Sequence, residues 1–479
     1  MPSFKTLPDY AQVKADITAL FAERVNQRRA PACFFSVFDA EGVLFEGGFG
    51  VKSLGHAPPD RQTRFRIASC TKSFTTAALL ILRDAGKILL DDPITTFVPA
   101  LRGTLPVSVP MVPTLRMLMA MSGGLPTDDP WADRQESLSR EAFLAILEAG
   151  VRFTTVPGSR FEYSNLGYAL LGQVVEQASG QPFQDFVTET LLQPLGLEMT
   201  TFDHATVPAA QMAAGYRVAH GEWRALPPSG PGAFSSIGGV ISTGEDLTKW
   251  ASWLCEAFRT DAPERSPLSA PSRREMQTIH CPIAPDPGED LLFKGYGFGL
   301  VAQTDARHGL TVHHSGGYPG FSSHMRWNPA AGIGIVGFEN ATYSGVLKPV
   351  TEALERLLDR AAPEAATEPP AEVAMLGGRV AELVARWDDS LAGDLFLENV
   401  AMDRPYAERA AELAELRAKL GTPDAKRAEI RPADGPMFGR FEVRVPCTTG
   451  VIVGVVGLGP PAPARIQSLT FKIDQWVQW

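Results

Sequence analysis

The sequence predicts a mixed α/β protein built from one large and one small domain. Through residue 360, segments with apolar residues at helical spacing alternate with short segments rich in β-branched and aromatic residues. Residues 361–372 are rich in Ala, Pro and Glu and show no periodicity, which is typical of a linker. Residues 373–479 show helical patterns followed by alternating strand patterns, which indicate a separate α+β domain.

The helices and strands of the large domain follow in chain order. Residues 9–29 predict an amphipathic helix, and residues 33–51 predict a β-hairpin around a Glu-Gly turn. Two apolar stretches predict buried helices, one beginning at Ser69 and one following Asn165. Strands are expected for YGFGLVAQTD, LTVHHSGG, SHMRWN and GIGIVGFEN, and a last helix for residues 344–361.

In the small domain, residues 373–391 and 405–420 predict two helices, and strands are expected from Ala428 onward. Helices followed by a strand meander are similar to cystatin-like and nuclear-transport-factor-like units. We expect an accessory role for this domain, such as covering a cleft, dimerisation or added stability.

Composition and charge argue against several classes of protein. Lys and Arg total 44 against 54 Asp and Glu, a formal net charge of −10 without any basic run, so we expect no nucleic-acid and no membrane partner. The five cysteines form no Cys-x-x-Cys pair, which favours a reducing compartment over a disulfide framework. Neither a leader-like pattern at the N-terminus nor about 18 uninterrupted apolar residues occurs, so we expect a soluble, cytoplasmic protein.

No metal or cofactor is expected. The eight histidines are scattered except for His313 and His314, and no metal-ligand spacing such as H-E-x-x-H occurs. A phosphate-binding loop and the G-x-S-x-G turn of α/β-hydrolases are also missing from the sequence.

The first chemical signal is Ser69-Cys70-Thr71-Lys72 at the start of a predicted helix. Three residues are nearly one helical turn, so the Ser69 hydroxyl and the Lys72 ammonium would share a face. A lysine in apolar surroundings has a lowered pKa and can accept the serine proton. The pair also fits a helix-capping Ser69 and a Lys72 whose stem covers apolar neighbours. We expect Cys70 to pack against the helical region rather than act as a thiol nucleophile.

Two later motifs supply further polar groups. Tyr163 could shuttle protons near an ammonium, and Asn165 could orient a lysine or a substrate carbonyl. The same segment also fits a core tyrosine beside a capping turn. The run His314-Ser315-Gly316-Gly317 lies on a predicted strand, where glycines allow close approach of a substrate and strand N–H groups could bind an oxyanion. It also fits a glycine-rich hairpin with a structural histidine.

Together these motifs resemble the serine β-lactamase and penicillin-binding-protein superfamily. The resemblance is greatest to the branch of class C β-lactamases, D-aminopeptidases and family VIII esterases, and it covers about residues 10–360. It extends to the surrounding segments FRIASCTKSFTTAALLILRDAGKILLDDPI, PGSRFEYSNLGYALLGQVVEQASG and HHSGGYPGFSS. It implies an antiparallel sheet built from both ends of residues 1–360, flanked by helices, with an inserted all-helical region.

The resemblance also implies residue roles. Ser69 would be the nucleophile, Lys72 its proton acceptor and Tyr163 a general base and acid. Asn165 would orient Lys72 and substrate, and the N–H groups of Ser69 and Gly317 would form an oxyanion hole.

The third motif departs from the family pattern. His314, Ser315 and Gly316 stand where β-lactamases carry Lys-Thr-Gly, and a neutral histidine attracts a substrate carboxylate less than a lysine does. We therefore expect a hydrolase of small esters or amides. The alternatives are a D-aminopeptidase or DD-peptidase, a weak β-lactamase, and a non-catalytic ligand-sensing relative. Self-association into a homo-oligomer stays open.

Overall fold

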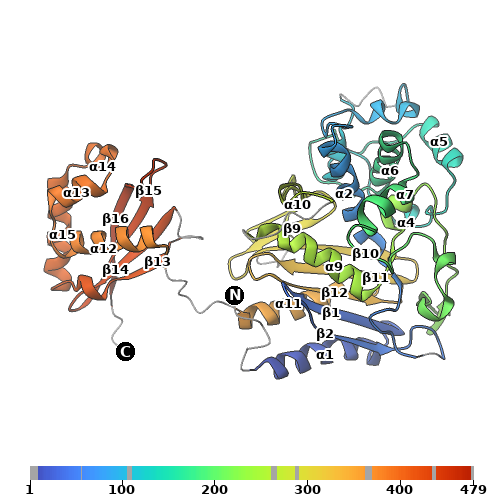
Figure 1. Ribbon diagram of the computed structural model, residues 1–479, viewed down its shortest axis with the longest axis horizontal. Coiled ribbons are helices and arrows are strands. Elements are labelled where there is room, and N and C mark those ends of the chain that lie inside the picture. The colour runs from blue at the N-terminus through green and yellow to red at the C-terminus, as the bar shows by residue number, and fades with distance from the viewer. Residues whose placement is uncertain are drawn as a thin grey trace. The chain divides into compact units, whose positions relative to one another are not determined.

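The computed structural model describes residues 9–55, 57–104, 111–259, 267–285, 291–361, 369–433 and 439–475. The chain divides into two compact units, residues 1–361 and 362–479 (Figure 1). Residues 362–368, most of the expected linker, lie outside the described part of the chain.

The large unit is built around an eight-stranded sheet in the order β2-β1-β12-β11-β10-β9-β8-β7, whose paired strands are antiparallel. The strands are β1 (Ala32–Asp39), β2 (Gly42–Gly50), β7 (Cys281–Pro282), β8 (Phe293–Tyr296), β9 (Val301–Asp305), β10 (Gly309–Tyr318), β11 (Phe321–Asn328) and β12 (Ile333–Glu339). Strands from both ends of the unit therefore share one sheet, which confirms the expected fold class.

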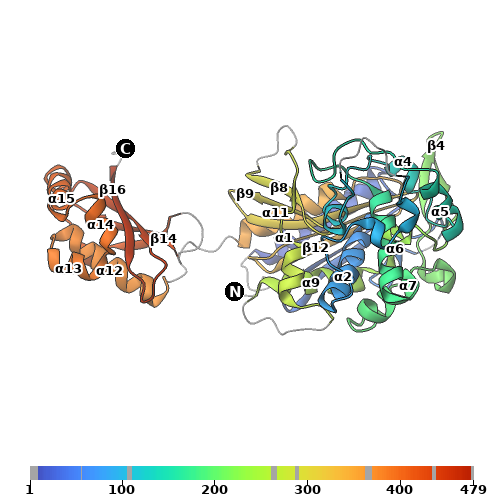
Figure 2. The same cartoon turned by 90° about the horizontal axis from the view of Figure 1, so that it is seen from above.

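Helices cover the two faces of this sheet (Figure 2). Helices α1 (Tyr10–Asn26) and α11 (Leu347–Ala361) pack against each other and the sheet, and α9 (Gly244–Cys255) packs against β1, β11 and β12. Every residue of β1 and of β12 is consequently buried. This explains why apolar residues do not alternate with exposed polar ones along either strand, although Ser36, Asp39 and Glu339 are buried polar residues.

A mostly helical region connects β2 to β7. Besides α9, its helices are α2 (Thr71–Asp84), α3 (Leu115–Met119), α4 (Asp129–Ala132), α5 (Arg140–Glu148), α6 (Asn165–Ser179), α7 (Phe183–Val187), α8 (Ser235–Gly238) and α10 (Ala270–Met276). The expectation of an all-helical insertion is wrong in detail. The region also contains the hairpin of β4 (Tyr216–Ala219) and β5 (Glu222–Ala225). In addition, β3 (Phe65–Arg66) pairs with β6 (Ile241–Ser242).

The small unit has its own apolar core. Its helices are α12 (Ala371–Ala385), α13 (Asp389–Leu395), α14 (Glu398–Asp403) and α15 (Tyr406–Leu420), and its sheet runs β13 (Glu429–Pro432), β14 (Arg440–Pro446), β15 (Gly450–Leu458), β16 (Ile466–Gln475). The prediction of one helix over 373–391 is wrong. Asp388 accepts hydrogen bonds from the N–H groups of Ser390 and Leu391 and so starts a new helix.

In the described ranges of both units, no helix combines the length and apolarity that crossing a membrane requires.

Candidate active site

Ser69 lies in a short 3₁₀ turn, Ala68–Cys70, directly before α2. Ala68 has a φ of 47°, a left-handed conformation that is strained for a residue with a Cβ and is found most often where function requires it. The alternative of Ser69 as a helix N-cap is wrong, because Cys70 occupies that position and no side chain caps the helix. The Ser69 hydroxyl is instead free to face Lys72.

Lys72 is fully buried one turn into α2. Its Nζ donates to Ser69 Oγ at 3.0 Å, to Asn165 Oδ1 at 2.7 Å and to the Ile237 carbonyl at 2.9 Å. Burial lowers the pKa of Lys72 to about 8, although the charges of nearby aspartates act in the opposite direction. A lysine with this pKa is accessible in its neutral form near physiological pH and can accept a proton.

Tyr163 completes a cluster around the Ser69 hydroxyl. Its side chain lies close enough to Ser69 for that residue to lower its pKa, and its ring centroid lies 5.1 Å from Lys72 Nζ. Burial raises the pKa of Tyr163 well above its usual value, so the phenol is protonated at neutral pH. Lys72 is therefore better suited than Tyr163 to take the first proton from Ser69.

Asn165 is held by carboxylates that precede and begin α4. Asp128 accepts from the Asn165 backbone N–H at 2.7 Å, and Asp129 accepts from Asn165 Nδ2 at 2.6 Å. With Nδ2 fixed as a donor, Oδ1 of Asn165 faces Lys72. Sequence reasoning missed these aspartates, because acidic residues at the start of a helix are common as favourable dipole partners.

His314 on β10 is uncharged at neutral pH. Its Nε2 accepts from the Tyr296 hydroxyl at 2.9 Å, and its Nδ1 donates to the Ser315 carbonyl at 2.7 Å. Burial and, secondarily, the charge of Lys72 lower the pKa of His314 to about 3. The neighbouring Ser315 hydroxyl lies 2.9 Å from Nδ1 of His324 on β11.

The glycines of β10 allow close approach on both sides of the strand. A Cβ on Gly316 would lie 2.2 Å from the Ile67 carbonyl oxygen, next to the turn that carries Ser69. A Cβ on Gly317 would lie 2.5 Å from the ring of Tyr343. Strand β9 pairs with β10 only as far as His313, so the stretch from residue 314 onward presents an edge that β9 leaves open.

These residues meet at a cavity of about 330 Å³. It is lined by Ser69, Asp129, Asp133, Phe161, Tyr163, Tyr296, Val301, His313, His314, Ser315, Gly317 and Tyr343. Of the eight predicted site residues, five line the cavity directly. Lys72 and Asn165 are fully buried and act through contacts with Ser69 and with each other, and Gly316 sets the distance between β10 and the Ser69 turn.

Comparison with known proteins identifies the family. The model of the β-lactamase family matches residues 17–360. The chain belongs to the β-lactamase family. It is similar to Protein flp of Staphylococcus aureus strain MW2, at 27% identity over 62% of this chain and 57% of that protein. The chain thus spans little more than half the length of that relative.

Two further comparisons bear on function and fold. The D-alanyl-D-alanine-carboxypeptidase/endopeptidase AmpH of Escherichia coli K12 is 27% identical over 69% of this chain and 84% of its own length. The solved octameric penicillin-binding protein homologue from Pyrococcus abyssi aligns with a TM-score of 0.62 at 21% identity, over 95% of this chain and 91% of its own. At that identity the second comparison supports the fold alone.

Cys70 contacts the sheet next to Ser69. Its Sγ lies 3.4 Å from the His314 carbonyl oxygen and 3.3 Å from Ser323 Oγ, so it packs against β10 and β11, and it belongs to the same buried apolar cluster as residues of α2 and α6. Burial raises the pKa of the Cys70 thiol to about 12. Cys70 therefore stays a thiol at neutral pH.

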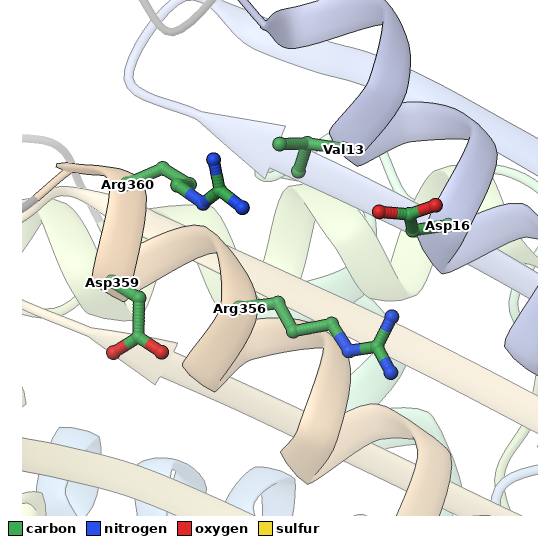
Figure 3. A pocket seen from close by; sticks show the side chains of 5 residues that line it. All are labelled: Val13, Asp16, Arg356, Asp359 and Arg360. Carbon is green, nitrogen blue, oxygen red and sulfur yellow. The ribbon is translucent and has the colours of Figure 1, made fainter.

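A second hollow, of about 190 Å³, lies between α1 and α11 (Figure 3). It is lined by Val13, Asp16, Arg356, Asp359 and Arg360. Its charged groups have partners: Arg356 pairs with Glu352, Asp359 with Arg307, and Arg360 with Asp9. Among the described residues that line it there is no serine, threonine, cysteine or lysine, so it is not a candidate site for acyl transfer to such a nucleophile.

Proposed function

We propose that this protein is a serine hydrolase that forms an acyl-enzyme on Ser69 and hydrolyses small esters or amides. The observation that carries the proposal is the 3.0 Å contact between Lys72 Nζ and Ser69 Oγ, with a fully buried lysine whose pKa is lowered to about 8. Membership of the β-lactamase family supports serine-hydrolase chemistry for residues 17–360.

The proposed reaction has two halves. Neutral Lys72 takes the proton of the Ser69 hydroxyl, and Oγ attacks the substrate carbonyl carbon. The N–H groups of Ser69 and Gly317 stabilise the resulting oxyanion, and Tyr163 relays the proton to the departing alcohol or amine as the carbon–leaving-group bond breaks. Water then attacks the acyl-enzyme with the same groups in reverse, which releases the acid and restores Ser69.

Intact-mass spectrometry of the full chain with a fluorophosphonate and, separately, with a penicillin tests this proposal. We expect one phosphonate adduct on the wild type and none on Ser69→Ala. The matched control is Ser159→Ala, which removes an exposed serine outside the cavity and should leave labelling intact. An unlabelled wild type, or a labelled Ser69→Ala variant, would refute Ser69 as the nucleophile.

The similarity to AmpH, a D-alanyl-D-alanine-carboxypeptidase/endopeptidase, supports a second candidate function, that of a peptidase acting on D-alanyl-D-alanine termini. Release of D-alanine from such a peptide would favour this candidate, and acylation by penicillin followed by its turnover would favour a weak β-lactamase. D-Amino-acid p-nitroanilides test the D-aminopeptidase alternative. Acylation without turnover would favour the ligand-sensing alternative.

Location and assembly form a further part of the proposal. The described cysteines are all free, which supports a cytoplasmic protein. The octameric archaeal relative supports a homo-oligomer, for which the 373–479 domain would provide an accessory surface. Light scattering on the full chain and on a chain ending at residue 361 tests both the assembly and that role.

A further inference from the structure

A buried ion pair lies close to the Ser69 turn and has no part in the reaction described so far. Arg66 in β3 and Glu136 in the segment between α4 and α5 are each 1% exposed, and Arg66 Nη1 donates to Glu136 Oε2 at 2.5 Å. Neither is among the described residues that line the cavity. Taking two charges out of water is unfavourable unless additional hydrogen bonds satisfy them, so the further partners of this pair show what it holds together.

The same carboxylate oxygen joins two more segments. Glu136 Oε2 also accepts from the Tyr318 hydroxyl at 2.6 Å and from Ser229 Oγ at 2.9 Å. Arg66 Nη2 donates to the Ser229 carbonyl at 2.5 Å. Burial and the charge of Glu136 raise the pKa of Tyr318, so its phenol stays protonated and donates. The other oxygen, Oε1, is buried and has no hydrogen-bond partner in the part of the chain that the structure describes, so Oε2 carries all of these bonds.

Through Arg66 this network anchors the turn that carries the nucleophile. Arg66 lies three residues before Ser69, and its backbone pairs with Ile241 in β6. Between them, Ala68 has the left-handed φ of 47°. Strained backbone persists only where its surroundings over-determine it, so a fixed Arg66 holds the Ser69 N–H in its orientation.

Through Tyr318 the network anchors the strand that carries the other oxyanion donor. Tyr318 directly follows Gly317 in β10. Successive side chains of a strand point to opposite faces, so Tyr318 shares with Gly316 the face that meets the Ser69 turn. The bond from Tyr318 to Glu136 therefore fixes β10 on that side, one residue beyond Gly317.

We propose that Glu136 is a positioning residue that holds the two N–H donors of the oxyanion hole at a fixed separation. Through Arg66 it fixes the donor of Ser69. Through Tyr318 it fixes the donor of Gly317. This role rests on the proposed acyl-enzyme chemistry at Ser69. Oxyanion donors act because they are held in place beforehand, and a misplacement of about 1 Å costs about a hundredfold in rate.

Tyr318→Phe tests the network with the ion pair left in place, since it removes one hydroxyl and keeps the ring. We expect kcat/KM for p-nitrophenyl acetate to fall about tenfold, because the end of β10 is no longer bonded to Glu136. Phenylboronic acid forms a tetrahedral adduct with an activated serine and places an oxygen in the oxyanion hole. Its affinity should fall by a similar factor. The pH dependence of kcat/KM, which Lys72 sets, should not move.

The matched control is Tyr216→Phe. The Tyr216 hydroxyl accepts from the Leu54 N–H at 2.8 Å, the residue is 2% exposed, and it lies outside the network and the cavity lining. We expect a comparable loss of stability in urea unfolding, with unchanged kcat/KM and boronate affinity. A merely structural network would make the two variants alike. Wild-type kcat/KM in Tyr318→Phe, or a loss of kcat/KM without weaker boronate binding, would overturn the proposal.

Glu136→Gln gives a second measure, because it removes the charge opposite Arg66. We expect a larger loss of kcat/KM than in Tyr318→Phe, and less than additive losses when the two are combined, since both act through one network. Additive losses would contradict the role of Glu136, and Tyr318→Phe decides alone if the Glu136→Gln chain does not fold. A wild type that neither turns over the ester nor forms a phosphonate adduct on Ser69 would instead refute the hydrolase proposal, and this role with it.

Discussion

A buried carboxylate should destabilise the folded protein, and the pKa of Asp133 allows the size of this effect to be worked out. Burial raises the pKa of Asp133 from 3.8 to about 6, even though the Tyr343 hydrogen bond and the charge of Lys72 act to lower it. A shift of about two pKa units corresponds to about 3 kcal/mol. We therefore expect Asp133→Asn to increase the free energy of unfolding by up to about 3 kcal/mol at pH 7.

The sign of the pH dependence follows from the direction of the shift. Because the pKa of Asp133 is higher in the folded than in the unfolded chain, the folded state favours the protonated carboxyl. That stabilisation is fully present below about pH 3.8 and is lost as the pH rises through about 6. The gain from Asp133→Asn should thus be largest at pH 7 and small at pH 4.

Urea unfolding of the full chain, monitored by tryptophan fluorescence, measures the gain in the free energy of unfolding at pH 7 and at pH 4. The matched control is Asp185→Asn, an exposed aspartate in α7, which should change the free energy of unfolding by less than about 0.5 kcal/mol. A gain of equal size at both pH values, or a loss at pH 7, would refute the reasoning that a desolvated carboxylate destabilises this site.

Three further outcomes are expected. Gly316→Ala should destabilise the protein by about 2 kcal/mol or more, since the new Cβ would meet a backbone oxygen at 2.2 Å, whereas Gly230→Ala, with open space around it, should be nearly neutral in the same thermal-unfolding assay. Because neutral Lys72 is the active form, kcat/KM should rise with pH through about 8, and Lys72→Arg should abolish the activity at every pH tested. Exhaustive chelation should leave turnover unchanged, and a loss restored by one added metal would contradict the proposed chemistry.

Local rules explain why much of the fold was predictable. The helix at Ser69 and the helix after Asn165 follow from long apolar runs, and the hairpin near residue 40 follows from its turn residues. The wrong prediction of one helix over 373–391 also came from a local rule, the apolar pattern along the chain. The apolar pattern continues through Asp388, and the capping bonds that begin a new helix there are not part of that pattern.

The sequence alone determined the spacing of Ser69 and Lys72 within one helical turn, and with it the chemistry open to that pair. Only the tertiary structure decided what surrounds them. Asp128 and Asp129 reach Asn165, and Asp133 reaches Tyr343, through contacts between segments distant in the chain. Periodicity and capping rules describe neighbours along the chain, whereas burial and charge, which set the pKa of Lys72, depend on neighbours in space.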